Sequence, residues 1–277
     1  MSAKRPLKRF GQHWLKSEKA LSKIIDAAQL HQSDRVLEIG PGTGILTSRL
    51  LEVSQAVTSV EIDRNLSKKL VQKFGKLDNF ILLEGDFLEL DIPQLLTPFS
   101  KFQNHNKVVA NIPYNITGLI LAKLFGTIYN PTDVSYDSVV LLIQKEVGDR
   151  LVARPGTKAY SALSVRMQYL TKCEFICDVP ARAFYPPPKV DSVVVRLSPK
   201  TLEKPAQNPQ LLGTLIKLGF ANRRKMLRNN LKSLILVEEL SAILEKLHIN
   251  PQARAENLSI QDWIDLSNNF PAIDSKC

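Results

Sequence analysis

The sequence predicts an α/β protein with a mostly parallel sheet covered by helices on both faces, followed by a small all-helical domain. Short apolar strands alternate with helical patterns over residues 35–143. This alternation is typical of parallel strands joined by right-handed crossovers. Two later strand patterns, at 174–179 and 192–197, have no long helix between them, so we expect an antiparallel hairpin. Residues 211–270 have a helical pattern only, broken at Asn250-Pro251.

A local sequence pattern predicts each helix and strand of the α/β part. The first helix is expected over 18–30, because Leu21, Ile24, Ile25 and Ala28 recur at helical spacing. Short apolar or β-branched runs then predict strands, and amphipathic stretches between them predict helices. The expected order is strand 35–39, helix 43–53, strand 56–62, helix 64–74, strand 80–84, strand 107–110, helix 119–125 and strand 138–143.

The chain is expected to have three parts. A basic segment occupies residues 1–17, an α/β domain 18–199 and a helical domain 200–277. Three prolines at 186–188 stiffen the connection between the two hairpin strands, and prolines among polar residues at 199–210 favour a linker.

Charge and composition limit the function classes. The 277 residues include 37 Lys and Arg against 27 Asp and Glu, a formal charge of +10, which favours a polyanionic partner such as nucleic acid. No apolar run approaches the roughly 20 residues that span a membrane, and no signal peptide is evident. Three cysteines, an odd number without zinc-ligand spacing, favour a reducing cytosol. We therefore expect a cytoplasmic protein with no membrane span and no metal site.

A glycine-rich turn, Gly40-Pro41-Gly42-Thr43-Gly44, follows the first strand of the alternation and opens a helix. Glycines there permit a tight turn and a close approach of a ligand, although such a turn also serves loop geometry alone. Glu61 ends the second strand, where an acid can bind ribose hydroxyls, and Asp86 ends the third, where an acid can accept from an adenine amine. Three strand ends facing one crevice favour an adenosine-containing ligand.

The turn fits S-adenosylmethionine better than a dinucleotide. A dinucleotide fingerprint requires a third glycine at position 45, which is Ile45 here. The acidic Glu38 just before the turn also disfavours a pyrophosphate. S-adenosylmethionine has ribose, adenine and a cationic sulfonium, and it tolerates acidic neighbours.

The run Asn111-Ile112-Pro113-Tyr114 ends the fourth strand. It could be an Asn-x-Pro turn with a core tyrosine. Alternatively it serves methyl transfer to the amine of a planar base. The Asn111 carboxamide oxygen and the Ile112 carbonyl would then accept the two amine hydrogens and direct the nitrogen lone pair at the methyl group. Tyr114 would stack on the base, and positioning and electrostatics would supply much of the acceleration.

Taken together and in order, these motifs resemble those of the ribosomal RNA adenine dimethyltransferases, and in particular of the bacterial small-subunit members. The resemblance covers nearly the whole chain and is carried by Gln12-His13-Trp14-Leu15, the 38–44 turn, Glu61, Asp86, 111–114, Phe184-Tyr185-Pro186-Pro187-Pro188-Lys189-Val190-Asp191-Ser192 and Arg223-Arg224-Lys225. One departure is Trp14, where the family usually has phenylalanine.

The resemblance implies a role for each matching residue. Residues 1–17 would close over the cofactor through His13 and Leu15, although His13 could also be a capping or solvated side chain. Phe184 would stack on the extruded adenine near Tyr114, as a base-modifying enzyme requires. The implied cofactor-binding residues are His13, Leu15, Gly40, Glu61, Asp86 and Asn111, and the implied catalytic residues are Asn111, Tyr114 and Phe184.

A run of basic residues in the helical tail is the expected RNA surface. It contains Arg223, Arg224, Lys225 and Arg228 and no acid between Lys217 and Lys232. Such a run is often only a solvated helix face. The overall basicity and the base-modifying site favour contacts to phosphates, which Arg5, Lys8 and Arg9 would extend.

The activity that the resemblance implies is dimethylation of the N6 amines of two adjacent adenosines in the 3′-terminal hairpin of small-subunit ribosomal RNA. The cofactor is S-adenosylmethionine, and the partner is that RNA within a small-subunit precursor, bound by a monomer. One alternative is a macrolide-resistance methyltransferase acting on large-subunit RNA, against which the 160–165 and 184–190 segments argue. A mitochondrial relative is disfavoured because no transit peptide is evident. Another alternative is a non-catalytic RNA-binding assembly factor, against which the presence of Glu61, Asp86 and Asn111 argues.

Overall fold

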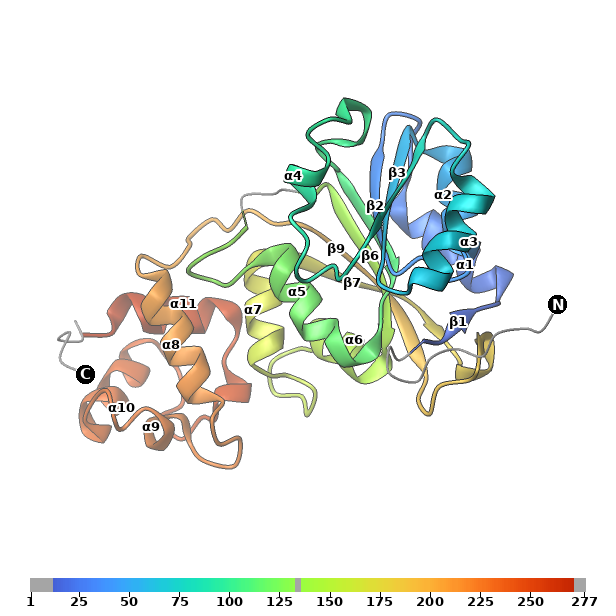
Figure 1. Ribbon diagram of the computed structural model, residues 1–277. Coiled ribbons are helices and arrows are strands. Elements are labelled where there is room, and N and C mark those ends of the chain that lie inside the picture. Colours follow the sequence, from blue (N-terminus) through green and yellow to red (C-terminus); the bar gives the residue numbers. More distant parts are fainter. Residues whose placement is uncertain (1–11, 133–135, 272–277) are drawn as a thin grey trace. The chain divides into compact units, whose positions relative to one another are not determined.

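A computed structural model of the chain describes residues 12–132 and 136–271 (Figure 1). The contacts divide the chain into two compact units. The sheet unit takes the described parts of Met1–Phe125, Thr132–Gly148 and Cys173–Pro199, and the helical unit takes those of Gly126–Pro131, Asp149–Lys172 and Lys200–Cys277.

The elements alternate between strands and helices up to β6 and are helical after β9. The strands are β1 (Trp14–Leu15), β2 (Arg35–Ile39), β3 (Ala56–Glu61), β4 (Phe80–Glu84), β5 (Lys107–Asn111), β6 (Ser138–Gln144), β7 (Thr171–Val179), β8 (Phe184–Tyr185) and β9 (Ser192–Pro199). The helices are α1 (Glu18–Ala28), α2 (Ile45–Val53), α3 (Arg64–Phe74), α4 (Ile92–Leu95), α5 (Thr117–Phe125), α6 (Lys145–Leu151), α7 (Ala162–Leu170), α8 (Pro209–Gly219), α9 (Leu227–Asn230), α10 (Val237–Lys246) and α11 (Ile260–Asn269).

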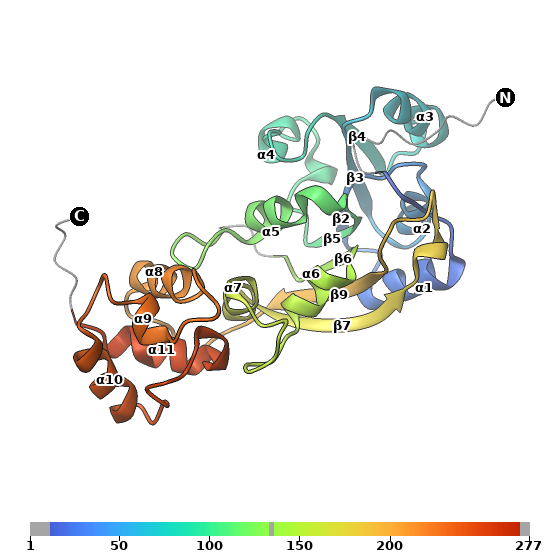
Figure 2. The ribbon, with the colours of Figure 1, turned by 90° about the horizontal axis from the view of Figure 1, so that it is seen from below.

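Seven strands form the main sheet in the order β4-β3-β2-β5-β6-β9-β7. The strands β4, β3, β2, β5 and β6 are parallel to their neighbours, and β9 is antiparallel to β6. Figure 2 shows β7 and β9 running in opposite directions at the edge of the sheet. After β2 the chain first adds β3 and β4 on one side and then returns to place β5 on the other. The carboxyl ends of β2 and β5 therefore flank a topological switch point, where ligands of such sheets bind.

Helices cover both faces of the sheet. Figure 1 shows α1, α2 and α3 on one face and α4 and α5 on the other. The first face buries Ile24 of α1, Leu50 of α2 and Leu70 of α3 in one apolar cluster with the sheet residues Val57 and Val140. Strands enclosed in this way read as continuous apolar runs in the sequence, which is why they could be predicted.

Polar residues fix where the helices of the sheet unit begin. The Ser17 side chain accepts from the Ala20 amide at the start of α1, and the Asp63 carboxylate accepts from the Asn65 and Leu66 amides at the start of α3. Such caps satisfy backbone N–H groups that have no partner inside a helix. Asp63 lies two residues after Glu61, so Glu61 is placed close to the start of α3.

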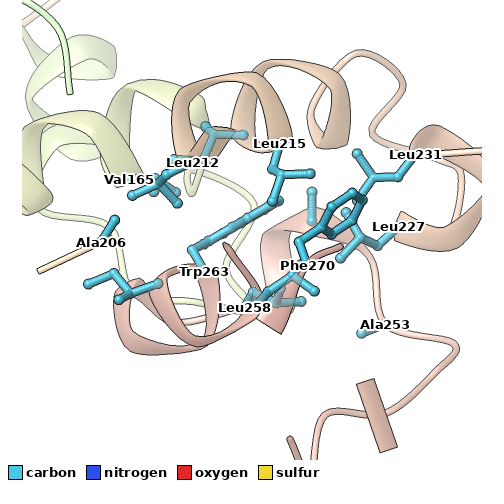
Figure 3. Packing of buried hydrophobic residues seen from close by; sticks show 14 of the residues in the cluster. Val165, Ala206, Leu212, Leu215, Leu227, Leu231, Ala253, Leu258, Trp263 and Phe270 are labelled. Carbon is cyan, nitrogen blue, oxygen red and sulfur yellow. The ribbon is translucent and has the colours of Figure 1, made fainter. Parts of the chain in front are cut away.

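The helical unit has an apolar core of its own (Figure 3). Trp263 of α11 is fully buried in it, with its ring 5.9 Å from that of Phe220. Leu212 and Leu215 of α8 and Val165 of α7 complete its surroundings in Figure 3. A segment from the middle of the chain thus takes part in the core of the unit that contains the C-terminal helices.

The predicted α/β class, the antiparallel strands and the helical tail are confirmed. The predicted spans of β2, α3 and β4 agree with the structure, and most other predicted elements differ by one to three residues at their ends. Five elements were missed: the helices α4, α6 and α7, and the strands β1 and β8, which form a two-stranded sheet. The boundaries 1–17, 18–199 and 200–277 stay predictions, and the contacts group 149–172 with the helical unit.

Candidate functional site

The carboxyl ends of β2, β3, β4 and β5 surround a cavity of about 250 Å³ in the sheet unit. The N-terminal residues 12–15 complete its wall. It is lined by all six residues predicted to bind the cofactor, His13, Leu15, Gly40, Glu61, Asp86 and Asn111, and also by Tyr114. Residues that are far apart in the sequence therefore meet where the switch point of the sheet places them.

The glycine-rich turn follows β2 and lines the cavity. Gly40 has φ +69°, a left-handed conformation that side chains other than glycine rarely adopt, and its amide donates to the Val60 carbonyl at 2.9 Å. A β-carbon added at Gly44 would lie 2.6 Å from Cε2 of Phe74, so the turn also fits closely against α3. Both glycines are needed where they stand.

Glu61 is held at the end of β3 by backbone donors. Its carboxylate accepts from the Gly42 amide at 3.1 Å and from the Asp63 amide at 2.9 Å. Burial raises the pKa of Glu61, while these two hydrogen bonds oppose the shift. The carboxylate is therefore rigid and fixed to the glycine-rich turn.

Glu38 is a buried acid whose hydrogen bonds are incomplete. Its Oε2 accepts from the hydroxyls of Thr47 and Ser59, both at 2.7 Å. Its Oε1 is buried and has no hydrogen-bond partner within the described ranges. Burial raises the pKa of Glu38 from 4.5 to about 7, and the nearby charge of Glu61 adds to the shift. From the sequence, Glu38 was expected only to disfavour a pyrophosphate. Its position in the cavity wall makes it a candidate ligand for a cation.

Asp86 follows β4 and is half-buried at the cavity wall. Its Oδ1 accepts from the Leu88 amide at 2.8 Å, which fixes the orientation of the carboxylate. The charge of Asp86 also acts on the Lys123 ammonium. The position is suited to accept a hydrogen bond from a ligand.

Asn111 is joined to the N-terminal segment. Its Nδ2 donates to the main-chain carbonyl of His13 at 3.2 Å. The His13 ring stacks on Tyr114, with centroids 5.6 Å apart and planes 23° from parallel, and its Nδ1 donates to the Pro186 carbonyl at 2.8 Å. Because Nδ2 of Asn111 makes this bond, Oδ1 is the atom of the carboxamide that is left to accept from a ligand.

Tyr114 begins the short turn after β5 and has a partner that the sequence analysis did not single out. Its hydroxyl shares a 2.5 Å hydrogen bond with the hydroxyl of Ser192, the fully buried first residue of β9. Burial raises the pKa of Tyr114, so the phenol stays neutral near pH 7. Ser192 is the last residue of the 184–192 motif, so the sequence already contained the residue that holds Tyr114.

Phe184 is not among the residues that line the cavity. It pairs with Leu15 in the two-stranded sheet of β1 and β8, and its ring is 1% exposed within the apolar cluster of the sheet unit. The next residue, Tyr185, is exposed because neighbouring side chains alternate along a strand. The stacking role of Phe184 stays a prediction that this conformation does not fulfil.

The predicted RNA-binding residues lie in the helical unit, three of them in the connection between α8 and α9 and Arg228 in α9. Arg224 and Lys225 are exposed, and Arg228 is half-buried. The Nη2 atom of Arg223 instead contacts the Lys158 and Tyr160 carbonyls and forms an ion pair with Glu256 at 2.7 Å. Arg5, Lys8 and Arg9, which were predicted to extend the RNA contacts, lie outside the described residues.

In residues 12–132 and 136–271, no helix is both long and apolar enough to cross a membrane. The same ranges contain no group of three or more His, Cys, Asp and Glu side chains arranged to hold a metal ion.

Comparison with known proteins identifies the family. Residues 3–271 match the family model described as ribosomal RNA adenine dimethylase. Similar curated proteins carry the name Ribosomal RNA small subunit methyltransferase A. The protein of Trichormus variabilis is 61% identical over 264 residues, covering 95% of this chain and 97% of its own, and that of Synechocystis is 54% identical over 275 residues, covering 96% and 97%.

Solved structures agree with this assignment. A dimethyladenosine transferase from Plasmodium falciparum superposes with a TM-score of 0.74 and 29% identity, covering 92% of this chain and 96% of that one. The 23S rRNA methyltransferase ErmE superposes with a TM-score of 0.70 and 27% identity, covering 91% and 97%. With the switch-point cavity and its predicted residues in place, the chain belongs to the ribosomal RNA adenine dimethylase family.

Proposed function

We propose that this protein transfers methyl groups from S-adenosylmethionine to the N6 amines of two adjacent adenosines in the 3′-terminal hairpin of small-subunit ribosomal RNA. The observation that carries the proposal is the 54–61% identity, over at least 95% of the chain, to relatives named as small-subunit methyltransferases. The structural likeness to ErmE at 27% identity does not separate the small-subunit RNA from the large-subunit RNA. Because the substrate would be a ribosomal particle, we also propose that the protein acts in the cytoplasm.

The residues of the cavity fit S-adenosylmethionine. Glu61 and Asp86 are acids at the ends of adjacent strands, suited to the ribose hydroxyls and the adenine amine. The unpartnered Oε1 of Glu38 offers a buried acceptor to a cationic group, and Gly40 lets a ligand approach the backbone. When bound, S-adenosylmethionine supplies an electrophilic methyl group on a sulfonium.

Asn111 and its neighbours would orient the target amine. The bond from Nδ2 to the His13 carbonyl holds the carboxamide, so that Oδ1 can accept one amine hydrogen. The Ile112 carbonyl, at the same strand end, would accept the second. These bonds favour a pyramidal nitrogen, and Tyr114, held by Ser192 and stacked on His13, would support the base. Such positioning lowers the barrier without a strong base.

The test is methyl transfer from labelled S-adenosylmethionine to purified small subunits that lack these methyl groups. Mapping of the modified nucleotides should place N6,N6-dimethyladenosine at two adjacent positions of the 3′-terminal hairpin. Product on large-subunit RNA would move the protein to the resistance type, and RNA binding without any transfer would make it an assembly factor.

Asp86→Ala is expected to weaken S-adenosylmethionine binding by roughly 1–3 kcal/mol, because the adenine amine loses its acceptor in a half-buried site. Titration calorimetry on the purified protein measures this loss. Asp149→Ala, a change of the same residue type in the helical unit, is the control and should leave the affinity unchanged. An unchanged affinity for a folded Asp86→Ala protein would contradict the role of Asp86.

Glu38 makes cofactor binding depend on pH. A cation at Oε1 favours the carboxylate, but with a pKa of about 7 the free protein holds a proton there in weakly acidic solution. S-adenosylmethionine binding must therefore release that proton, and the affinity should fall by up to tenfold per unit as the pH drops below about 7. Calorimetry in buffers of different ionisation enthalpy would measure the proton release.

The matched variant Glu38→Gln should lose that proton release and weaken binding above pH 7. It should also be more stable than the wild type there. The wild type keeps a proton in the folded state between its ordinary pKa of 4.5 and about 7, so its unfolding free energy falls as the pH rises through this window. If proton release were the same in both proteins, Glu38 would not be the group that titrates.

A further inference from the structure

Three segments of the helical unit lie side by side and are strongly basic. They are residues 154–160, 222–228 and 253–257, which contain seven basic residues and one acid, Glu256. The first and third are joined by the Gly156 amide, which donates to the Glu256 carbonyl. The second and third are joined by the Leu227 amide, which donates to the Ala253 carbonyl at 2.8 Å.

Arg223 joins all three segments. Its Nη2 lies 2.8 Å from the Lys158 carbonyl, 3.1 Å from the Tyr160 carbonyl and 2.7 Å from the Glu256 carboxylate. The pair of Arg223 and Glu256 is partly shielded, with side chains 44% and 23% exposed. The one acid of the three segments is therefore neutralised by a side chain that also fixes the 158–160 loop.

Five of the other six cations are exposed, and Arg228 is half-buried. No hydrogen bond or ion pair within the described residues occupies the side chains of Arg154, Lys158, Arg224 and Lys225. Held on one connected scaffold, they form a surface of a single charge sign, which attracts a polyanion. Here we call the three segments together the basic surface.

We propose that the basic surface binds the phosphodiester backbone of RNA, with Arg154 and Lys158 contacting phosphates alongside Arg224 and Lys225, while Arg223 is the positioning residue that holds the three segments together. This inference rests on the proposed function, which supplies an RNA substrate. It extends the predicted interface to a loop more than 60 residues earlier in the chain and removes Arg223 from the direct contacts.

The first experiment measures how binding to purified small subunits depends on salt. The double variant Arg154→Ala/Lys158→Ala should reduce the slope of log affinity against log salt by about 1.4–1.8, which corresponds to two lost phosphate contacts. The control Lys204→Ala/Lys246→Ala removes two exposed lysines outside the basic surface and should keep the slope of the wild type. An unchanged slope for Arg154→Ala/Lys158→Ala would overturn the proposal.

The second experiment tests Arg223 through its acid partner. Arg223→Ala should weaken binding, because it frees the charge of Glu256 and releases the 158–160 loop. The double variant Arg223→Ala/Glu256→Gln should recover part of that affinity, since the repelling charge is gone. If Arg223 contacted a phosphate directly, Arg223→Ala would lower the salt slope by about 0.7–0.9, and Glu256→Gln would not restore that contact. Hydrogen exchange at the Gly156 amide, which should become faster in Arg223→Ala, reports on the released loop independently.

Two further measurements separate the alternatives. The control Lys204→Ala/Lys246→Ala should transfer methyl groups at the wild-type rate. A wild-type protein without methyl transfer would refute the proposed function, whereas the salt slopes would still test the basic surface. Vesicles containing phosphatidylserine provide the other anionic partner. Binding to vesicles that the double variant loses, with an unchanged slope on small subunits, would assign the basic surface to membranes and overturn the proposal.

Discussion

Asn111→Ala is expected to lower the single-turnover rate of methyl transfer about 100-fold or more, with little change in RNA affinity. The amine loses the acceptor Oδ1, and the His13 carbonyl loses the donor that ties the N-terminal segment to β5. Small displacements of reacting groups can cost on the order of 100-fold in rate. Phosphate contacts dominate RNA affinity, so binding should persist. Single-turnover transfer with saturating cofactor is the measurement.

Asn111→Asp distinguishes hydrogen bonding from charge. A carboxylate of the same shape would favour a nitrogen that becomes cationic, so a charge argument predicts full activity. However, the structure places the His13 carbonyl at the position of the lost donor, where a carboxylate oxygen would be repelled. We expect a loss as large as in Asn111→Ala. Asn130→Ala, an exposed asparagine outside the cavity, is the control. A near-wild-type rate for Asn111→Ala would rule out the amine-positioning role.

Trp263→Ala is expected to destabilise the helical unit by about 3 kcal/mol. Truncation of a fully buried tryptophan costs roughly 3–5 kcal/mol through lost burial and the cavity left behind. The indole Nε1 is buried and has no partner within the described residues, so its removal relieves an unfavourable desolvation and places the net loss at the lower end. Urea unfolding followed by circular dichroism should show the helical unit melting earlier.

Trp263→Phe is the matched control for that prediction. A phenyl ring fills much of the same space without a donor, so we expect a stability close to that of the wild type. Cofactor affinity should survive in both variants, because the residues that line the cavity all belong to the sheet unit. Equal stability of Trp263→Ala and the wild type would show that the core of the helical unit tolerates the cavity.

The sequence predicted the sheet well because its strands are enclosed apolar runs. The missed α7 shows the opposite case: its buried residues Ser164, Val165, Met167 and Tyr169 lie on more than one side of the helix, so they produce no clear helical stripe. The strands β1 and β8 are two residues long and depend on each other across the chain. No local pattern could reveal such a pairing.

The predicted site was recognisable for a topological reason. Carboxyl ends of adjacent parallel strands meet at one edge of a sheet, so Glu61, Asp86 and Asn111 had to converge once the strands were identified. Long-range pairings decided the rest. Phe184 lies in β8, which pairs with β1, and its ring is buried. Arg223 forms an ion pair with Glu256 instead of remaining solvated with the other basic residues of its run. Neither partner is visible from the neighbouring residues.

The pairing of residues 14–15 with 184–185 also has a consequence for protein synthesis. His13 contacts a carbonyl 173 positions later in the chain, and the wall of the cavity includes residues 12–15. At about 5–20 residues per second, a ribosome needs roughly 9–35 s to produce that partner. A nascent chain therefore cannot hold its N-terminal strand in place while the parallel strands emerge. The complete cavity can therefore form only late in translation, and we expect shorter nascent chains not to methylate ribosomal RNA.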